Sequence, residues 1–297
     1  MNNSELNSII EEWVGINSSV VPLHKSCRNE IFIVTGETGE FILKVIKDSS
    51  MDVSTEQNVI SHIPLDVNVR RILNYKNIED DISIVLYPYI HGQTIDNIEL
   101  NNINDDQLVI WKNDLIKMLD AFTNIPVDKV GVLNNNLIGS HNSWYEFISH
   151  YINSQIIKGP LASNIYGSRI RKVVKKNKRV FLDAGVKLCP MDLNQRNFLI
   201  NEDKHLIMLH TPVLWVCDPQ AIIGELSVHL TNTRLLEMLI NHYNVPETNR
   251  YLYEALMAFT ILVYQERFSI NPIHEALVWG SDVTLFSLLE EALQNCE

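Results

Sequence analysis

The first 90 positions have the hydrophobic pattern of a small β-rich lobe. The runs 31–35 and 41–46 are separated by Gly36-Glu37-Thr38-Gly39, a turn that predicts a hairpin. In chain order the pattern predicts a short amphipathic helix from near Ser4, strands over 31–35 and 41–46, a helix over 52–63, and strands over 69–73 and 82–86, with a polar turn at 76–81.

Beyond Gly92 the pattern changes to long helical periods interrupted by short apolar runs. Helices are predicted over 105–123, 143–154, 168–184, 225–243, 248–268 and 273–294. Short strands are predicted over 186–189, 198–200, 206–209 and 213–217, where turn residues bound runs too short for helices. The chain is therefore expected to be an α+β protein, with a sheet lobe at 1–90 and a larger helical lobe at 91–297.

The composition excludes several classes of protein. Apolar residues make up 46% of the chain, which is ordinary for a packed globular protein. The formal net charge of −12 argues against nucleic acid as a partner. The N-terminal stretch is acidic and no apolar run is long enough to span a bilayer, so we expect a cytoplasmic protein without a membrane segment.

Cysteines and the one basic run offer little chemistry. Cys27, Cys189, Cys217 and Cys296 form no CxxC pair and have no histidine at metal-ligand spacing, so they are interpreted as reduced thiols. The run 169–179 carries apolar residues at helical spacing, which favours a solvated helix face over an anion site.

The segment that follows the predicted strand 186–189 has the strongest pattern for catalysis. Asp192 and Asn197 lie five residues apart between two apolar runs, so both side chains are able to face one cleft. Such spacing recurs by chance, as at Asp96 and Asn101. A second acid, Asp218, ends the apolar run 213–217, and two acids delivered by neighbouring strands are typical of a Mg²⁺ site for phosphoryl transfer.

Lys44 lies inside the apolar strand 41–46, where a cation needs a partner unless it faces solvent. Glu56 shares the inward stripe of the predicted helix with Val59, Ile60 and Ile63, which indicates an ion pair with Lys44.

These residues resemble the aminoglycoside phosphotransferase family of the protein-kinase-like superfamily, over about residues 25–270. The matching motifs are a strand lysine (Lys44), a helix glutamate (Glu56), a catalytic loop (Met191-Asp192-Leu193-Asn194-Gln195-Arg196-Asn197) and a later Asp (Asp218). The stretch Asp218-Pro219 to Gly224-Glu225 is similar to the metal segment of streptomycin- and fructosamine-type kinases. The resemblance implies a bilobal protein-kinase-like fold, with an antiparallel-sheet N-lobe and a helical C-lobe.

The resemblance also implies roles for these residues and the cofactors ATP and Mg²⁺. Asp192 would deprotonate the acceptor hydroxyl, and Asn197 and Asp218 would bind Mg²⁺. Lys44 would hold the α- and β-phosphates, with Glu56 fixing it. The stretch Tyr87-Pro88-Tyr89-Ile90 looks like the inter-lobe hinge, where backbone groups near Tyr89 and Ile90 would contact adenine.

Two departures from the family pattern concern the catalytic loop. Pro190-Met191 replaces the usual His-Gly before the catalytic Asp, and proline lacks a backbone donor. His229 stands where relatives have an Asp that braces this loop. The favoured interpretation is that a different contact supports the catalytic loop, because both partners of the usual one are altered. A catalytically inactive pseudokinase is the alternative.

Three functions therefore remain open. The leading one is a phosphotransferase that modifies a hydroxyl of a cationic antibiotic, aminoglycoside-like or peptide, because an acidic lobe would concentrate such a substrate. A metabolic kinase for a sugar, choline-like or amino-alcohol substrate shares every motif. The third is a nucleotide-binding pseudokinase. Trp144, Glu146, Tyr264 and Glu266 are candidates for the acceptor site.

Overall fold

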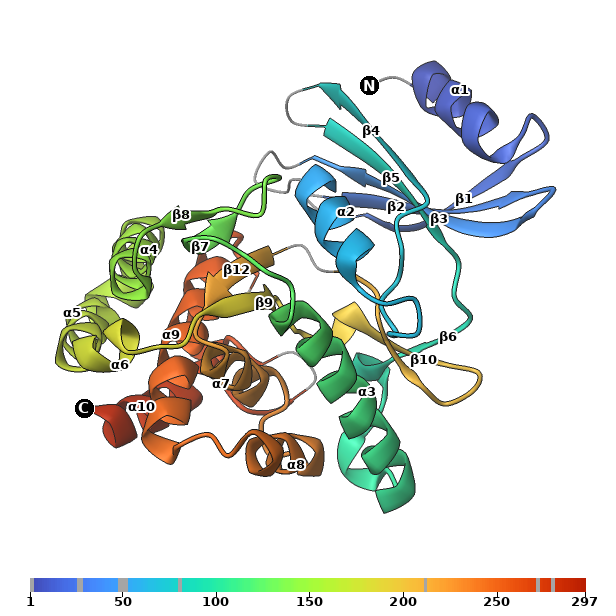
Figure 1. Ribbon diagram of the computed structural model, residues 1–297. Helices are drawn as coiled ribbons and strands as arrows, with labels where there is room; N and C mark the ends of the chain where they lie inside the picture. Colours follow the sequence, from blue (N-terminus) through green and yellow to red (C-terminus); the bar gives the residue numbers. More distant parts are fainter. Residues whose placement is uncertain are drawn as a thin grey trace.

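A computed structural model of the chain describes residues 3–25, 29–47, 53–79, 82–210, 213–270, 273–278 and 281–297. Its elements form a sheet lobe and a larger helical lobe (Figure 1). The first lobe contains α1 (Asn3–Val14), β1 (Ser19–Lys25), β2 (Asn29–Gly36), β3 (Gly39–Ile46), α2 (Val53–His62), β4 (Asn74–Glu79) and β5 (Ile82–Pro88).

The second lobe follows β6 (Gly92–Thr94) and two short 3₁₀ turns. Its helices are α3 (Asp105–Thr123), α4 (Trp144–Lys158), α5 (Pro160–Lys176), α6 (Lys178–Leu182), α7 (Gln220–His229), α8 (Arg234–Tyr243), α9 (Glu247–Arg267) and α10 (Leu285–Cys296). Its strands are β7 (Val130–Leu133), β8 (Gly139–His141), β9 (Lys187–Met191), β10 (Phe198–Asn201), β11 (Leu206–Met208) and β12 (Val213–Cys217).

The five-stranded sheet of the first lobe has the order β1-β2-β3-β5-β4, with antiparallel pairing throughout. Alternation along β3 sends Leu43 and Val45 to the face covered by α1. Ile42 and Ile46 lie on the opposite face with Val53 of α2. Lys44 shares the parity of Ile42 and Ile46, so the strand itself directs this cation toward α2.

Two smaller sheets position the second lobe's loops. β10 lies between β11 and β6, and a four-stranded sheet has the order β8-β7-β12-β9. Several of the helices around them start at side-chain caps: Asn104, Ser143, Thr233 and Thr284 each accept a backbone N–H of the first helical turn. Such caps explain why these helices begin where they do.

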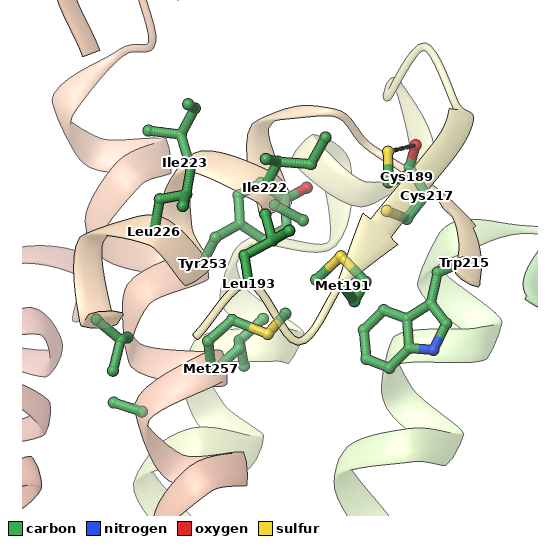
Figure 2. Packing of buried hydrophobic residues seen from close by; sticks show 14 of the residues in the cluster. Cys189, Met191, Leu193, Trp215, Cys217, Ile222, Ile223, Leu226, Tyr253 and Met257 are labelled. Atoms are coloured by element: carbon green, nitrogen blue, oxygen red, sulfur yellow. Dashed lines mark hydrogen bonds between the residues drawn. The ribbon is translucent and has the colours of Figure 1, made fainter. Parts of the chain in front are cut away.

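Helices α7 and α9 make the closest helix contact near the catalytic loop. A Cβ built on Gly224 would come within 2.7 Å of the backbone carbon of Tyr253, so only glycine permits this approach. The contact brings Tyr253 beside Ile222 and Leu226 in the core shown in Figure 2. The glycine of the Gly224-Glu225 motif therefore has a packing role.

The expected α+β class with a bilobal arrangement is confirmed, as are the hairpin β2–β3 and the strands near 186–189, 198–200, 206–209 and 213–217. The strand predicted over 69–73 is wrong, because β4 occupies 74–79 instead. The helix predicted over 225–243 is divided into α7 and α8. The helix predicted over 273–294 is matched by α10, which begins only at Leu285. Strands β1, β6, β7 and β8 are not among the predicted strands.

Cys189, Cys217 and Cys296 are buried free thiols, whereas Cys27 lies outside the described residues. In the basic run, Arg169 pairs with Glu290 and Glu297 of the C-terminal helix region, at 2.8 and 2.7 Å. Among the helices that the structure describes, none combines the length and apolar character that a membrane crossing requires.

Candidate active site

The catalytic loop leaves β9 at Met191 and reaches β10 at Phe198. Met191 and Leu193 are 3% and 2% exposed, and Figure 2 shows both directed into the apolar core. Asp192 lies between them, half-buried, with a backbone φ of 64°. Anchoring both neighbours in the core turns the Asp192 side chain the other way, at the cost of a left-handed backbone conformation.

Side chains within the loop hold Asp192 in this conformation. Asn197 Nδ2 donates to the Asp192 carbonyl at 2.6 Å, and Asn194 Nδ2 donates to Asp192 Oδ1 at 2.6 Å. One carboxylate oxygen is thereby fixed by an amide. The bond from Asn197 Nδ2 also leaves its Oδ1 as the acceptor that is available to a ligand.

Helix α7 braces the loop from behind. Glu225 Oε1 accepts the Leu193 N–H at 2.9 Å and also interacts with the Asp192 N–H. Gln195 Nε2 donates to the His229 carbonyl at 2.8 Å. Sequence comparison placed the brace at position 229, but the structure assigns the carboxylate brace to Glu225, and His229 contributes its backbone carbonyl.

The buried environment of Glu225 destabilises the charged form of its carboxylate. Burial raises the pKa of Glu225 to about 8, with a further contribution from the negative charge of Asp192, while the two backbone N–H groups oppose the shift. Burial likewise lowers the pKa of His229 to about 4. Both side chains are therefore expected to be neutral at pH 7.

Pro190, the departure that precedes Met191, sits in β9 opposite Leu214 of β12. Among the strands that the structure describes, β9 is the last of its sheet and pairs on one edge only, with β12. A proline is tolerated at the other edge because its missing N–H breaks no ladder bond on that side. Pro190 is therefore compatible with both β9 and the catalytic loop that follows it.

Lys44 and Glu56 are brought together as the sequence predicted, but with a third residue between them. Lys44 is 6% exposed, which excludes the solvent-facing alternative. Its Nζ lies 2.8 Å from His210 Nε2, and His210 Nδ1 lies 3.1 Å from Glu56 Oε1. Burial lowers the pKa of Lys44 to about 8, and the charges of Glu56 and Asp192 oppose the shift.

A second cation borders this group. Arg70 Nε donates to the Leu209 carbonyl at 2.9 Å, and its guanidinium stacks 4.2 Å from the ring centre of Tyr87. Tyr87 is fully buried at the end of β5. Arg70 lowers the pKa of both Lys44 and His210 after the larger effect of burial, so the three groups share one electrostatic environment.

The predicted hinge extends from β5. The Tyr89 N–H donates to the Glu40 carbonyl at 3.1 Å and continues the pairing with β3. Because successive groups of an extended chain point to opposite sides, the Pro88 carbonyl and the Ile90 N–H face away from β3. The predicted adenine contact near Tyr89 and Ile90 therefore narrows to those two backbone groups and stays a prediction.

Asp218 does not join this group. In the β9–β12 pair, Met191 lies opposite Val213 and Lys187 lies opposite Cys217. Asp192 follows Met191 at one end, whereas Asp218 follows Cys217 at the other. The four residue steps between these ends span roughly 13 Å at about 3.3 Å per residue. The expectation that Asp218 meets Asn197 and Asp192 at one cation is therefore corrected.

Asp218 instead lies just before helix α7, which begins at Gln220 with Pro219 as its N-cap residue. Its Oδ1 accepts the Gln220 N–H at 3.0 Å, and its Oδ2 accepts the Tyr253 hydroxyl at 2.7 Å. The Tyr253 oxygen in turn accepts the indole N–H of Trp144 at 3.2 Å. Asp218 is 3% exposed, and burial raises its pKa. Asp218 is therefore committed to the turn before α7 and to a buried hydrogen-bond chain.

The site fits Mg²⁺ poorly as a result. Mg²⁺ prefers oxygen ligands in octahedral geometry, and Asn197 Oδ1 is the one side-chain oxygen of the predicted pair at the loop. Just beyond β11, the Leu209 N–H donates to the Asn197 carbonyl at 2.8 Å. The next residue, His210, therefore lies beside Asn197, where a second oxygen ligand would be needed. Within the described residues, no group of three His, Cys, Asp or Glu side chains is arranged to hold a metal.

Replacing Tyr253 with Phe is expected to lower the free energy of unfolding by about 1–3 kcal/mol, because Asp218 and Trp144 would each lose a buried partner. Chemical denaturation measures the change. Tyr251→Phe is the matched control on the same helix, where the ring is half-buried against the Arg250 guanidinium. Equal stability losses in the two variants would contradict the buried chain.

Two of the acceptor-site candidates are committed to internal structure. Trp144 is 1% exposed and donates to Tyr253. The carboxylate of Glu266 accepts the N–H groups of Leu161 and Ala162, both at 2.9 Å, and so caps helix α5. These two candidates are therefore excluded, while Glu146 remains exposed at the start of α4.

No family model matches the sequence, and no curated protein matches it. Solved structures share the fold. A thermostable mutant of aminoglycoside phosphotransferase APH(4)-Ia, in ternary complex with AMP-PNP and hygromycin B, superposes with a TM-score of 0.71 at 12% identity, over 98% of this chain and 96% of that one. Wild-type aminoglycoside 2'-phosphotransferase-IIIa with GDP gives 0.69 at 15% identity, over 99% of both chains. The chain therefore has the aminoglycoside phosphotransferase fold.

Proposed function

We propose that this protein is a nucleotide-dependent phosphotransferase that acts on a hydroxyl group of a small molecule. The observation that carries the proposal is the Asp192 loop, held by Asn197 and Glu225, facing a buried Lys44 that contacts His210 and is influenced by Glu56. The shared fold with aminoglycoside phosphotransferases supports it.

The residues divide the work between two lobes. Asp192, half-buried with one oxygen held by Asn194, would orient the acceptor hydroxyl and take its proton. Lys44 would hold the nucleotide phosphates, with its ammonium positioned by Glu56 and His210. The Pro88 carbonyl and the Ile90 N–H would bind the base of ATP or a related purine nucleotide, with Tyr87 packed behind them.

We infer a cationic acceptor from the formal charge of −12, which would concentrate such a compound. The solved neighbours were captured with hygromycin B and, in APH(2")-IIia, with kanamycin. That supports a cationic antibiotic, aminoglycoside-like or peptide, as the first class to examine. A sugar, choline-like or amino-alcohol acceptor for a cytoplasmic metabolic kinase uses the same machinery.

A panel assay tests the phosphotransferase and separates the acceptor classes. Purified protein is incubated with ATP or GTP and each compound, and nucleoside diphosphate release and phosphorylated product are measured by mass spectrometry. Product from an antibiotic but not from metabolic alcohols would establish the antibiotic class, and the reverse would establish the metabolic one. No product across both panels would contradict transfer.

A second candidate, a nucleotide-binding protein without transfer activity, is favoured by one specific observation. Asp218 is buried in the turn before α7, and His210 stands beside Asn197 in its stead. Nucleotide binding without turnover on any acceptor, unchanged by Asp192→Asn, would favour this candidate.

A further inference from the structure

His210 occupies the position where the phosphates of a nucleotide would meet both lobes. The Leu209 N–H bonds to the Asn197 carbonyl at 2.8 Å, so residue 210 follows directly beside the catalytic loop. The same side chain reaches Lys44 of β3 and Glu56 of α2. Its imidazole is 9% exposed. No other described histidine bonds to the side chains of both Lys44 and Glu56.

The hydrogen bonds define the form of the imidazole. A lysine ammonium donates only, so Nε2 of His210 must accept, and Nδ1–H must donate to Glu56. The residue is then neutral, and protonation would place a donor against the Lys44 ammonium. Burial and the charges of Lys44 and Arg70 lower the pKa of His210, against the opposing effect of Glu56, in agreement with this form.

Two cations and two carboxylates surround His210 and Lys44. Lys44 and Arg70 contribute two cations, and Glu56 contributes the carboxylate that faces His210. Asp192, which also influences Lys44, has one oxygen held by Asn194 and is assigned to the acceptor hydroxyl. The oxygen ligand expected from Asp218 lies at the far end of β9–β12. A nucleotide phosphate therefore finds the cations Lys44 and Arg70 here, whereas a magnesium ion would find an imidazole in place of the carboxylate expected from Asp218.

We propose that this site binds nucleotide phosphates without a divalent cation, with His210 as the positioning residue that holds Lys44 toward them in place of a metal-binding carboxylate. The inference rests on the proposed nucleotide site. It concerns how that site neutralises phosphate charge, and it holds for either of the two candidate functions.

The test measures ADP affinity by isothermal titration calorimetry at pH 7.5, in EDTA and in excess MgCl₂. For the wild-type chain we expect dissociation constants within about threefold of each other, and loss of binding in Lys44→Ala. In His210→Asp a carboxylate would adjoin Asn197, and we expect Mg²⁺ to strengthen binding by about tenfold or more. His210→Gln supplies a neutral acceptor and donor and is expected to resemble the wild type.

The other outcomes overturn the inference in distinguishable ways. Wild-type binding that weakens about tenfold or more in EDTA would overturn it and leave the nucleotide site standing; loss of the Mg²⁺ effect in Asp218→Asn would then identify Asp218 as the ligand. Absence of ADP binding in both buffers would overturn the nucleotide site as well. The wild-type comparison decides the question even if His210→Asp does not fold, which circular dichroism would reveal.

Discussion

Replacing Asp192 with Asn is expected to lower turnover by about 10²–10⁴-fold while nucleotide affinity changes little, because the amide cannot accept the proton of the acceptor hydroxyl. Asn is the appropriate substitution since it tolerates the left-handed backbone, φ 64°, that Asp192 adopts. Its side-chain oxygen is also able to keep the bond from Asn194. Steady-state kinetics with an acceptor found in the panel, beside calorimetry with ADP, measures both quantities.

Asp203→Asn provides the matched control, since it makes the same change of charge at an exposed position of the β10–β11 turn. It is expected to leave turnover within about twofold of the wild type, as surface substitutions usually do. If Asp192→Asn retained full turnover, the proposed base would be wrong. If it abolished nucleotide binding instead, Asp192 would belong to the nucleotide site.

Apolar periodicity was sufficient for most of the fold because most elements bury one continuous face. It failed at β4, whose sequence Asn74-Tyr75-Lys76-Asn77-Ile78-Glu79 is largely polar. β4 is the last strand of its sheet and pairs with β5 alone, so its side chains need not be apolar. β1 lies at the other edge of the same sheet and was missed too.

The helix predicted over 225–243 is divided by a local backbone feature that apolar periodicity does not reveal. Asn232 has a backbone φ of 59°, and the Thr233 hydroxyl accepts the Leu236 N–H at 3.3 Å, which starts α8 afresh. A Thr-Asn-Thr stretch inside an apolar repeat was a readable signal of this restart.

The site was predictable where contacts are local and not where they depend on pairing between distant strands. The apolar residues that flank Lys44 and the inward stripe of α2 indicate an ion pair between Lys44 and Glu56. Asp218 and His210 each follow a short apolar run, but only Asp218 is predicted from the sequence for this position. Only the pairing of Leu209 with Asn197, and of Met191 with Val213, decides between them. Asp218 was predicted because a carboxylate binds Mg²⁺, whereas the strand register places His210 beside Asn197.

Replacing Glu225 with Ala is expected to lower the free energy of unfolding by about 3–5 kcal/mol. It would leave the Leu193 and Asp192 N–H groups without their buried acceptor, at about 1–3 kcal/mol each, and would open a cavity beneath the loop. Turnover should fall too, because the left-handed conformation of Asp192 loses its brace. Glu237→Ala, at an exposed position of α8, is the control and should change stability by about 0.5 kcal/mol or less.

The pH dependence of Glu225→Gln separates the role of the brace from that of its charge. Burial raises the pKa of Glu225 from its ordinary value near 4.5 to about 8, so the folded state holds this proton more tightly than the unfolded state. The resulting stability is fully present below about pH 4.5 and is lost as pH rises through about 8. His229, with its pKa lowered to about 4, is neutral in both states above about pH 7.5.

Between about pH 5 and 8, wild-type stability should therefore fall relative to Glu225→Gln, which cannot titrate, and above about pH 8 the difference should level off. The slope is at most about 1.4 kcal/mol per pH unit for one proton. Urea denaturation of both proteins at several pH values in this window measures the difference between their free energies of unfolding. Titrating groups that the two proteins share contribute equally to both and cancel from this difference. A difference that stays constant, or that grows in favour of the wild type, would mean that the carboxylate is charged beneath the loop. The brace would then act as a fixed negative charge and not as a neutral acceptor.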